Sequence, residues 1–362
     1  MVAVMGGSLA ALRADPARLD DVFGTLRARV AEGVIPSAAL AVGDAAGQIR
    51  AEAFGPGGRT LDPDTNFFLA SITKPIFATA FMQLVEDGVV GLREPIKRWF
   101  PEFADGEKAE ITPWHLLTHT SGVSDFAPED IIRRRPSAAQ MTQHVTEAQL
   151  RFTPGTRYEY CSASFYLLAR IIEVEIGLGY ARFLRERVTE PLGIGLTFDP
   201  RRAGRPIVAV HGAGVDNRFI RFMVLRYMAG AALPGGGLFG SLADLARYGA
   251  ALLEPVRAGD RAALPLRRET FNDMTRDQLG GLPGVYDGEE RSIHFGLGWG
   301  KPTLMRDWPG SDSTVSHGGA TGGRLWIDPE PGLVLAFLTN RWSADRGPEV
   351  EAISGVYEAL EG

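Results

Sequence analysis

The sequence predicts an α/β fold of the α+β type, in which a mixed antiparallel sheet is flanked by N- and C-terminal helices and joined to a mainly helical domain. Three observations support this class. A helix pattern and two strand patterns open the chain, helical patterns dominate its middle, and strand patterns followed by a helix close it. Because strands occur at both ends, we expect residues 1–66 and 235–362 to form one discontinuous sheet domain and residues 67–234 to form the helical domain.

The N-terminal part predicts one helix and one hairpin. Apolar residues recur at helical spacing over residues 16–32, between a proline start signal and a glycine stop signal. Two short strand-like runs follow at 37–42 and 48–54, separated by the turn-forming stretch 43–47. We therefore expect an antiparallel pair of strands directly after the first helix.

The middle and the C-terminal part predict helices and strands in turn, each bounded by Gly, Pro, Asp or Asn. The expected helices are 113–119, 138–150, 164–176, 180–188, 241–253 and 348–360, and the expected strands are 294–299, 314–317, 323–327 and 333–339. Residues 122–137 and 205–230 carry no readable pattern, and we expect loops there that form the walls of a pocket.

Composition limits the classes of function. The chain has 362 residues, of which 45% are hydrophobic, enough for a large core. Its net charge is −6, with arginines scattered along the chain, so we expect no nucleic-acid partner. The single cysteine, Cys161, excludes an intrachain disulfide and a multi-cysteine metal site.

Location is predicted from two missing signals. No apolar run approaches the roughly 20 residues that cross a bilayer, so we expect no membrane partner. The N-terminal stretch lacks the basic leading region of a secretory signal, so we expect a cytoplasmic protein. The sequence does not indicate the oligomeric state.

The first candidate site is the pair Ser71 and Lys74. A buried helix face follows at three- and four-residue spacing, and Pro75 is tolerated only near a helix start, so the helix should begin at about Ser71. Residues three apart share a helix face, and an amine of lowered pKa can take the proton of a serine hydroxyl. The alternative is that Ser71 only caps the helix and Lys74 is a solvated surface lysine.

Two further clusters are candidates for the same site. An extended backbone after the turn at 153–156 would present Tyr160 and Ser162 on one side. Tyr160 would then act as a phenolate or as a hydrogen-bond relay to Lys74, unless it is simply a packed tyrosine. In the second cluster, 316–323, glycines would let a strand edge approach a substrate, and the N–H of Ala320 could face an oxyanion, unless the segment is only a hairpin turn.

Two patterns resemble cofactor sites without supporting one. His115 and His119 are four residues apart, as in metal-binding helices, but Leu116 stands where the general base belongs, so we expect structural roles for both histidines. The glycines of 235–240 match a dinucleotide fingerprint, yet no convincing strand precedes them. We therefore expect neither a metal nor an organic cofactor.

Taken together, the motifs resemble those of the serine β-lactamase-like family, which comprises class C β-lactamases, penicillin-binding proteins, family VIII carboxylesterases and related amide hydrolases. The resemblance extends from about residue 20 to 345. It rests on Ser71-Ile72-Thr73-Lys74, the run 114–122, Pro154-Gly155-Thr156 leading to Tyr160, Glu190-Pro191-Leu192-Gly193, Gly235-Gly236-Gly237-Leu238 and His317-Gly318-Gly319. It implies a β-lactamase/transpeptidase-like fold with the site in the cleft between the two domains.

The resemblance also implies roles for the candidate residues. Ser71 would be the acylated nucleophile, Lys74 its base, and Tyr160 the proton shuttle that helps to activate the deacylating water. The N–H groups of Ser71 and Ala320 would form the oxyanion hole. Substrate would contact the remaining positions of the motifs, which are Ser162, His317, Gly318 and Gly319.

Two departures from the family pattern direct the prediction toward neutral substrates. Ser162 stands where β-lactamases usually carry Asn, and His317 where they usually carry a lysine that favours anionic substrates. We therefore expect a serine hydrolase of esters of small acyl groups, similar to family VIII carboxylesterases and working without metal or cofactor. The alternatives are a linear-amide hydrolase of the 6-aminohexanoate-oligomer type, a D-peptide hydrolase, a weak β-lactamase, an acyltransferase, or a catalytically silent binding scaffold.

Overall fold

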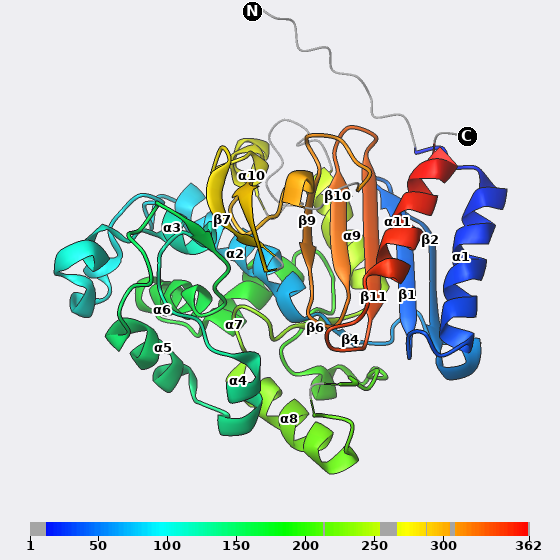
Figure 1. The fold of residues 1–362 in the computed structure, drawn as a ribbon, viewed down its shortest axis with the longest axis horizontal. Helices are drawn as coiled ribbons and strands as arrows, with labels where there is room; N and C mark the ends of the chain where they lie inside the picture. The colour runs from blue at the N-terminus through cyan, green and yellow to red at the C-terminus, as the bar shows by residue number, and fades with distance from the viewer. Residues whose placement is uncertain (1–11, 213, 254–265, 287, 305–307, 361–362) are drawn as a thin grey trace, which may run out of the picture.

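The computed structural model describes residues 12–212, 214–253, 266–286, 288–304 and 308–360. A six-stranded antiparallel sheet has the strand order β3-β2-β1-β11-β10-β9, so both ends of the chain build it, as predicted (Figure 1). Its strands are β1 (Ala38–Asp44), β2 (Gly47–Gly55), β3 (Arg59–Thr60), β9 (Val315–Gly318), β10 (Arg324–Asp328) and β11 (Leu333–Thr339).

The central strands of this sheet are buried on both sides because helices cover both of its faces. α1 (Pro16–Ala31) and α11 (Gly347–Leu360) pack together on one face, and α9 (Leu242–Leu253) lies on the other (Figure 1). Alternate residues of β1 follow the same division: Leu40 packs in the core of α1 and α11, whereas Ala41 packs in the core that contains α9. The predicted helices at both ends and the predicted hairpin are therefore confirmed.

The mainly helical half is organised around α2 (Thr73–Glu86), in which every residue from Thr73 to Leu84 is buried. This half also contains α3 (Pro113–Leu117), α4 (Pro128–Arg134), α5 (Ala138–Glu147), α6 (Ser164–Ile176), α7 (Tyr180–Leu184) and α8 (Arg218–Ala231). α2 contacts both α6 and α7, and Phe77 meets the rings of Phe165 and Tyr180 edge-on. The fold class is thus confirmed, while the numerical boundary between the two domains stays a prediction.

Three differences from the sequence-based expectations have local causes. The predicted strand 294–299 is wrong: the strand is β8 (Glu289–Ile293), paired with β7 (Leu282–Tyr286), and the next residues leave the extended state at Gly298, whose φ is +78°. The predicted helix 113–119 ends at Leu117, because His119 adopts a positive φ of 58°. The unreadable segments 122–137 and 205–230 are only partly loops, since they contain α4 and most of α8.

The remaining elements complete the description. A two-residue strand, β4 (Phe67–Phe68), pairs with β6 (Phe239–Gly240), and β5 (Tyr158–Glu159) pairs with β7 in a small parallel contact. α10 (Arg268–Thr275) contacts α2. None of the helices in the described ranges is both long enough and apolar enough to span a bilayer.

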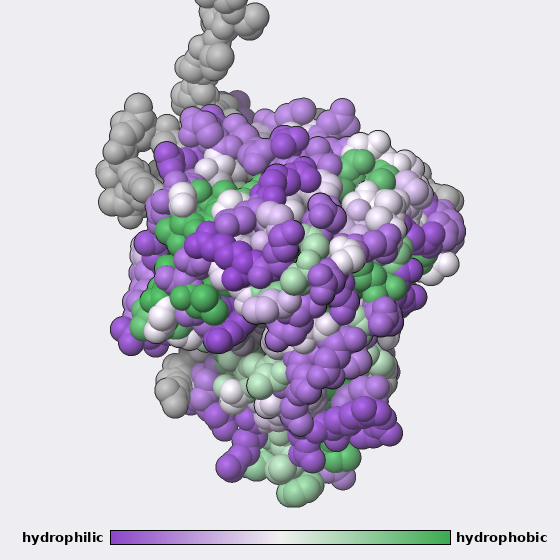
Figure 2. Space-filling view, turned by 90° about the vertical axis from the view of Figure 1, so that its left-hand side faces the viewer, coloured by the Kyte–Doolittle hydropathy of each residue, from purple (hydrophilic) through white to green (hydrophobic). Residues whose placement is uncertain are grey.

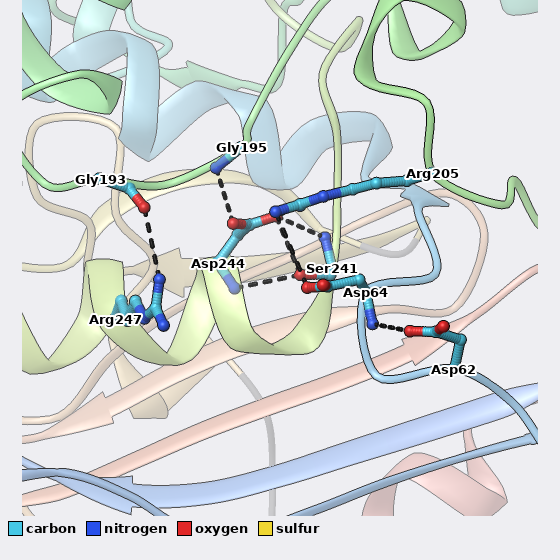
Figure 3. A network of polar contacts seen from close by, with 8 residues as sticks. All are labelled: Asp62, Asp64, Gly193, Gly195, Arg205, Ser241, Asp244 and Arg247. Atoms are coloured by element: carbon cyan, nitrogen blue, oxygen red, sulfur yellow. Dashed lines mark hydrogen bonds and ion pairs between the residues drawn. The ribbon is translucent and has the colours of Figure 1, made fainter.

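A buried carboxylate fastens the start of α9 to the chain that leads toward α8 (Figure 3). Asp244 is 2% exposed, and its oxygens accept hydrogen bonds from the Gly195 amide at 2.7 Å and from both the amide and the hydroxyl of Ser241. Arg205 reaches the same carboxylate at 2.7 Å and Asp64 at 3.7 Å. The network holds three chain segments together. Asp244 can be buried because its charge is paired with Arg205 and its oxygens accept hydrogen bonds.

Candidate functional site

Ser71 lies on a single 3-10 turn, Ala70–Ile72, which leads directly into α2. The turn is held from two sides: the Leu69 amide donates to the Leu238 carbonyl, and Gly319 passes so close that a Cβ there would lie 2.6 Å from the Leu69 carbonyl oxygen. Ala70 accepts a φ of +46° in this arrangement. Ser71 is therefore half-buried and held in a fixed position beside the segment 316–323.

Lys74 lies in the first turn of α2 and is completely buried. Its Nζ is 3.2 Å from the Ser71 Oγ, 3.1 Å from the Ser162 Oγ and 2.6 Å from the Gly235 carbonyl oxygen. Burial lowers the pKa of this amine to about 7, although the nearby Asp125 carboxylate opposes the shift. The alternative of a solvated surface lysine is excluded, and an appreciable fraction of the amine is neutral near pH 7.

Tyr160 reaches the same centre from a distant part of the chain. The Lys74 Nζ lies 4.7 Å from the centre of its ring, and its hydroxyl forms hydrogen bonds with the side chains of Ser71 and Ser162. Burial raises the pKa of the Tyr160 phenol well above its usual value. Of the two roles considered from sequence, this favours a neutral hydrogen-bonding relay over a phenolate.

His119 supports the segment that carries Tyr160. Its ring centre is 4.6 Å from that of Tyr160, and its Nδ1 lies 3.1 Å from both the amide nitrogen and the carbonyl oxygen of Cys161. The His119 carbonyl also accepts a hydrogen bond from the Glu159 amide. Burial, followed by the charge of Lys74, keeps the pKa of His119 well below its usual value, so the ring packs in its neutral form.

The structure separates the two histidines that resembled a metal motif. His115 turns to the start of its own helix, where its Nδ1 accepts a hydrogen bond from the Thr112 amide at 3.1 Å. Burial lowers the pKa of His115 to about 4. Across the described ranges, no group of three or more His, Cys, Asp or Glu side chains is placed to hold a metal ion.

Sequence reasoning missed two residues that hold the site together. Asp125 accepts hydrogen bonds from the amides of Ser162 and Ala163, at 2.6 and 2.9 Å, and so fixes the two residues that directly precede α6. The other is the Gly235 carbonyl, which receives the shortest contact of Lys74. Asp125 lies in an unpatterned loop and gave no signal, whereas the glycine run 235–237 was visible but pointed to nucleotide binding.

The cluster 316–323 begins on β9, an edge strand of the six-stranded sheet. His317 is 7% exposed, its Nδ1 contacts the Gly318 carbonyl oxygen at 2.8 Å, and burial lowers the pKa of its ring to about 3. Ala320 is exposed and lines the same hollows as Ser71. The structure therefore gathers all the site residues predicted from sequence around one serine, while their chemical roles stay predictions.

Two hollows meet at Ser71, and one is more strongly apolar than the other. One is an apolar cavity of about 530 Å³, whose walls include Phe126, Met141, Val208, Leu225, Met228 and Phe239. The other is a cleft of about 490 Å³, which includes Tyr286, Ser316, His317, Gly318, Arg324 and Arg346. Both also include Tyr160 and Ala320, so the two hollows adjoin at Ser71.

Known proteins resemble the chain over most of its length. The chain is 31% identical to "Esterase EstB" of Burkholderia gladioli over 330 residues, covering 78% of this chain and 79% of the relative. It is 29% identical to "Penicillin-binding protein 4" of Amycolatopsis lactamdurans over 337 residues, covering 90% and 85%. The solved structure of "EstCE1, a hydrolase with promiscuous acyltransferase activity" shares the fold with a TM-score of 0.75 at 20% identity, covering 94% of this chain and 99% of that one.

The family assignment rests on a profile as well as on these relatives. The profile described as "Beta-lactamase" matches residues 22–356, a range that contains every element from β1 to β11 and all of the gathered site residues. Together with the serine and the buried amine at its centre, this match confirms the resemblance stated from the motifs. The chain belongs to the β-lactamase family of serine hydrolases.

Proposed function

We propose that the protein hydrolyses carboxylic esters through an acyl-enzyme intermediate on Ser71, with Lys74 as the base. The observation that carries this proposal is the buried Lys74 amine, 3.2 Å from the Ser71 Oγ and with a pKa of about 7. A nucleophilic serine needs a neighbouring group that accepts its proton, and the pKa of the best base lies near the working pH.

The contacts of Lys74 also orient its lone pair. A neutral amine has two N–H donors and one lone pair. If the Gly235 carbonyl and the Ser162 hydroxyl accept the two N–H groups, at 2.6 and 3.1 Å, the lone pair is left for the Ser71 hydroxyl. Ser162 therefore helps to position the base as well as contacting substrate.

Each half of the reaction moves one proton away from a nucleophile and one onto a leaving oxygen. Ser71 Oγ attacks the ester carbonyl as Lys74 takes its proton, and the alcohol departs with a proton delivered through Tyr160. Water then attacks the acyl-Ser71 carbonyl and loses a proton to the same pair, after which Ser71 leaves as its hydroxyl. The raised pKa of Tyr160 suits a phenol that donates and immediately regains its proton.

The oxyanion hole and the substrate contacts are part of this proposal. The N–H groups of Ser71 and Ala320 would hold the developing oxyanion, and each such donor contributes on the order of 10²–10³ in rate. His317, Gly318 and Gly319 would form the strand edge along which the substrate lies. Gly319 suits this position because a side chain there would collide with the backbone that carries Ser71.

The two hollows favour an ester with an apolar acyl group. Deacylation reverses acylation with water in place of the alcohol, so the side that releases the alcohol must admit water. The cleft beside β9, which includes His317, Arg324 and Arg346, fits this side, and the more strongly apolar cavity fits the acyl chain, with room for groups larger than acetyl. His317, uncharged near pH 7, offers no cation to the carboxylate of a β-lactam.

Covalent labelling tests the nucleophile. A fluorophosphonate should add mass to the peptide that contains Ser71, and Ser71→Ala should abolish the labelling. Ser162→Ala is the matched control, because Ser162 is the other serine within 3.2 Å of the Lys74 amine. The control should still be labelled on Ser71. A wild-type protein labelled on Ser162 would overturn the proposed nucleophile.

Substrate pairs test the reaction class. The protein should turn over nitrophenyl esters much faster than the isosteric nitroanilides. It should turn over a chromogenic cephalosporin poorly. Lys74→Met keeps the apolar volume of the side chain and should lower ester turnover by about 10²–10⁴. Preferred release of amine would instead support a linear-amide or D-peptide hydrolase.

A cytoplasmic location remains a prediction. The N-terminal stretch on which it rests lies largely outside the described residues. We likewise propose a small-molecule ester or amide as the partner of the site.

A further inference from the structure

The outer face of α8 exposes large apolar side chains. Phe219 is 71% exposed, Phe222 55% and Ile220 42%. Among the described residues, half of the exposed large hydrophobic side chains lie on this one helix, and no residue of α8 is buried. Figure 2 shows green side chains at the lower end of the molecule, where Figure 1 places α8.

Basic side chains accompany the exposed rings. Arg218 and Arg226 are exposed, and Arg226 follows Phe222 by four residues, so the two share one helix face. α8 contains no acidic residue, and neither arginine side chain has an ion pair or hydrogen bond with another described residue. In a chain of net charge −6, this helix is therefore a local basic and apolar surface.

A second basic segment adjoins α8. The Tyr227 hydroxyl donates to the Pro136 carbonyl oxygen at 2.8 Å, which brings the end of α4 beside the helix. Arg133, Arg134 and Arg135 directly precede this proline, and the first two contact Asp130. Arginines thus lie on both α8 and its neighbour.

The opposite face of α8 belongs to the apolar cavity. Val224, Leu225 and Met228 line the cavity that also contains Ser71, whereas Phe219 and Phe222 do not. One helix therefore has an inner face toward the candidate acyl site and an outer face of aromatic rings and arginines. Such a basic helix with exposed aromatic residues is typical of segments that lie in a membrane interface.

We propose that α8 docks on an anionic phospholipid surface, with Phe219 and Phe222 inserted among the acyl chains and Arg218 and Arg226 at the phosphates. A second copy of the chain fits this face less well. In a symmetric dimer the same arginines would face one another, and three apolar side chains fall short of the roughly 1,000 Å² that a stable interface buries.

This inference does not depend on the proposed ester hydrolysis, since it uses only the outer face of α8. It departs from the sequence-based expectation of no membrane partner, which rested on the lack of a long apolar run. A helix that lies in the interface needs no such run, because one face only is buried. Docking would place the cavity mouth beside lipid-dissolved, amphiphilic esters.

Vesicle sedimentation of the full chain tests the proposal. The wild-type protein should bind vesicles of phosphatidylglycerol and phosphatidylcholine, and bind pure phosphatidylcholine vesicles more weakly. The double variant F219S/F222S should lose at least about tenfold in partitioning, since each ring loses its burial. The variant R218Q/R226Q should lose roughly tenfold of the preference for anionic vesicles.

The double variant I49S/V174S is the matched control, because Ile49 and Val174 are 44% and 47% exposed but lie on β2 and α6. It should bind anionic vesicles as the wild type does. All variants should keep the wild-type thermal transition, which reports on the fold. They should also keep the activity on a soluble nitrophenyl ester, which reports on the site. A wild type without turnover would refute the proposed function, while vesicle binding would still report on α8.

Three results would overturn the proposal. The wild type could fail to bind anionic vesicles, or F219S/F222S could bind them as well as the control. In the third result, light scattering would show a wild-type dimer that F219S/F222S converts to a monomer, so that a second copy covers the face.

Discussion

Two helices, α9 and α8, are similar in length but opposite in burial. Nine of the twelve residues of α9 are buried, whereas none of the fourteen residues of α8 is buried. Buried contacts determine how much a segment contributes to global stability, and sparsely packed segments open locally at lower cost. We conclude that α9 supports the fold, while α8 lines the cavity with its inner face and leaves its outer face exposed.

The largest expected effect on stability is at the start of α9. Asp244→Ala removes the carboxylate that Gly195, Ser241 and Arg205 contact, and it should lower the free energy of unfolding by about 3–5 kcal/mol. Arg226→Ala, on the exposed face of α8, should change it by less than about 0.5 kcal/mol. Chemical denaturation measures both, and equal losses would contradict the contrast between the helices.

A matched pair of leucines compares packing in the two helices. Leu245→Ala leaves a void in the completely buried face of α9 and should cost about 2–4 kcal/mol in the free energy of unfolding. Leu225→Ala, in α8, should cost less than about 1 kcal/mol, because its site is only half-buried. Leu225→Ala should instead change the ratio of turnover between long-chain and acetyl esters, and an unchanged ratio would argue against an acyl chain in the cavity.

The pH dependence of turnover tests the role of Lys74 independently of α8 and α9. Lys74 must be neutral to accept a proton and its pKa is about 7, so kcat/KM should fall as pH drops below 7, by about 100-fold over two pH units. Leu225→Ala should leave the midpoint unchanged. Asp125→Asn should move it to lower pH, because the carboxylate raises the pKa of the amine, and an unmoved midpoint would argue against Lys74 as the titrating group.

The smallest effects should have opposite signs at two helical glycines. A Cβ on Gly249 of α9 would lie 2.5 Å from the Val334 Cγ1, so Gly249→Ala should destabilise the protein by about 1–2 kcal/mol. A Cβ on Gly230 of α8 meets nothing within 4 Å, so Gly230→Ala should stabilise the helix by up to about 0.5–1 kcal/mol. Thermal unfolding distinguishes the two signs, and destabilisation by both changes would show that α8 is packed more tightly than its exposure indicates.

The same contrast explains which elements could be read from the sequence. α6 and α9 are rich in apolar residues at helical spacing, so both were readable, and the prediction of 164–176 coincides with α6. α8 mixes arginines with apolar residues on two differently used faces, so its period was hidden within 205–230. The strand predicted at 294–299 is wrong because the buried apolar residues of this segment belong to a loop. The loop turns at Gly298, which lies beside Ala78 of α2.

Local pattern was enough to define the fold class, the family and the cluster of candidate residues, because helix period, strand alternation and the Ser71 and Lys74 spacing are properties of short segments. It could not show that Lys74 is completely buried, that Asp125 binds the amides of Ser162 and Ala163, or that two hollows meet at Ser71. These features depend on contacts between residues far apart in the chain. Burial by distant segments sets both the pKa of the amine and the exposure of α8, and neither is encoded in a single stretch of sequence.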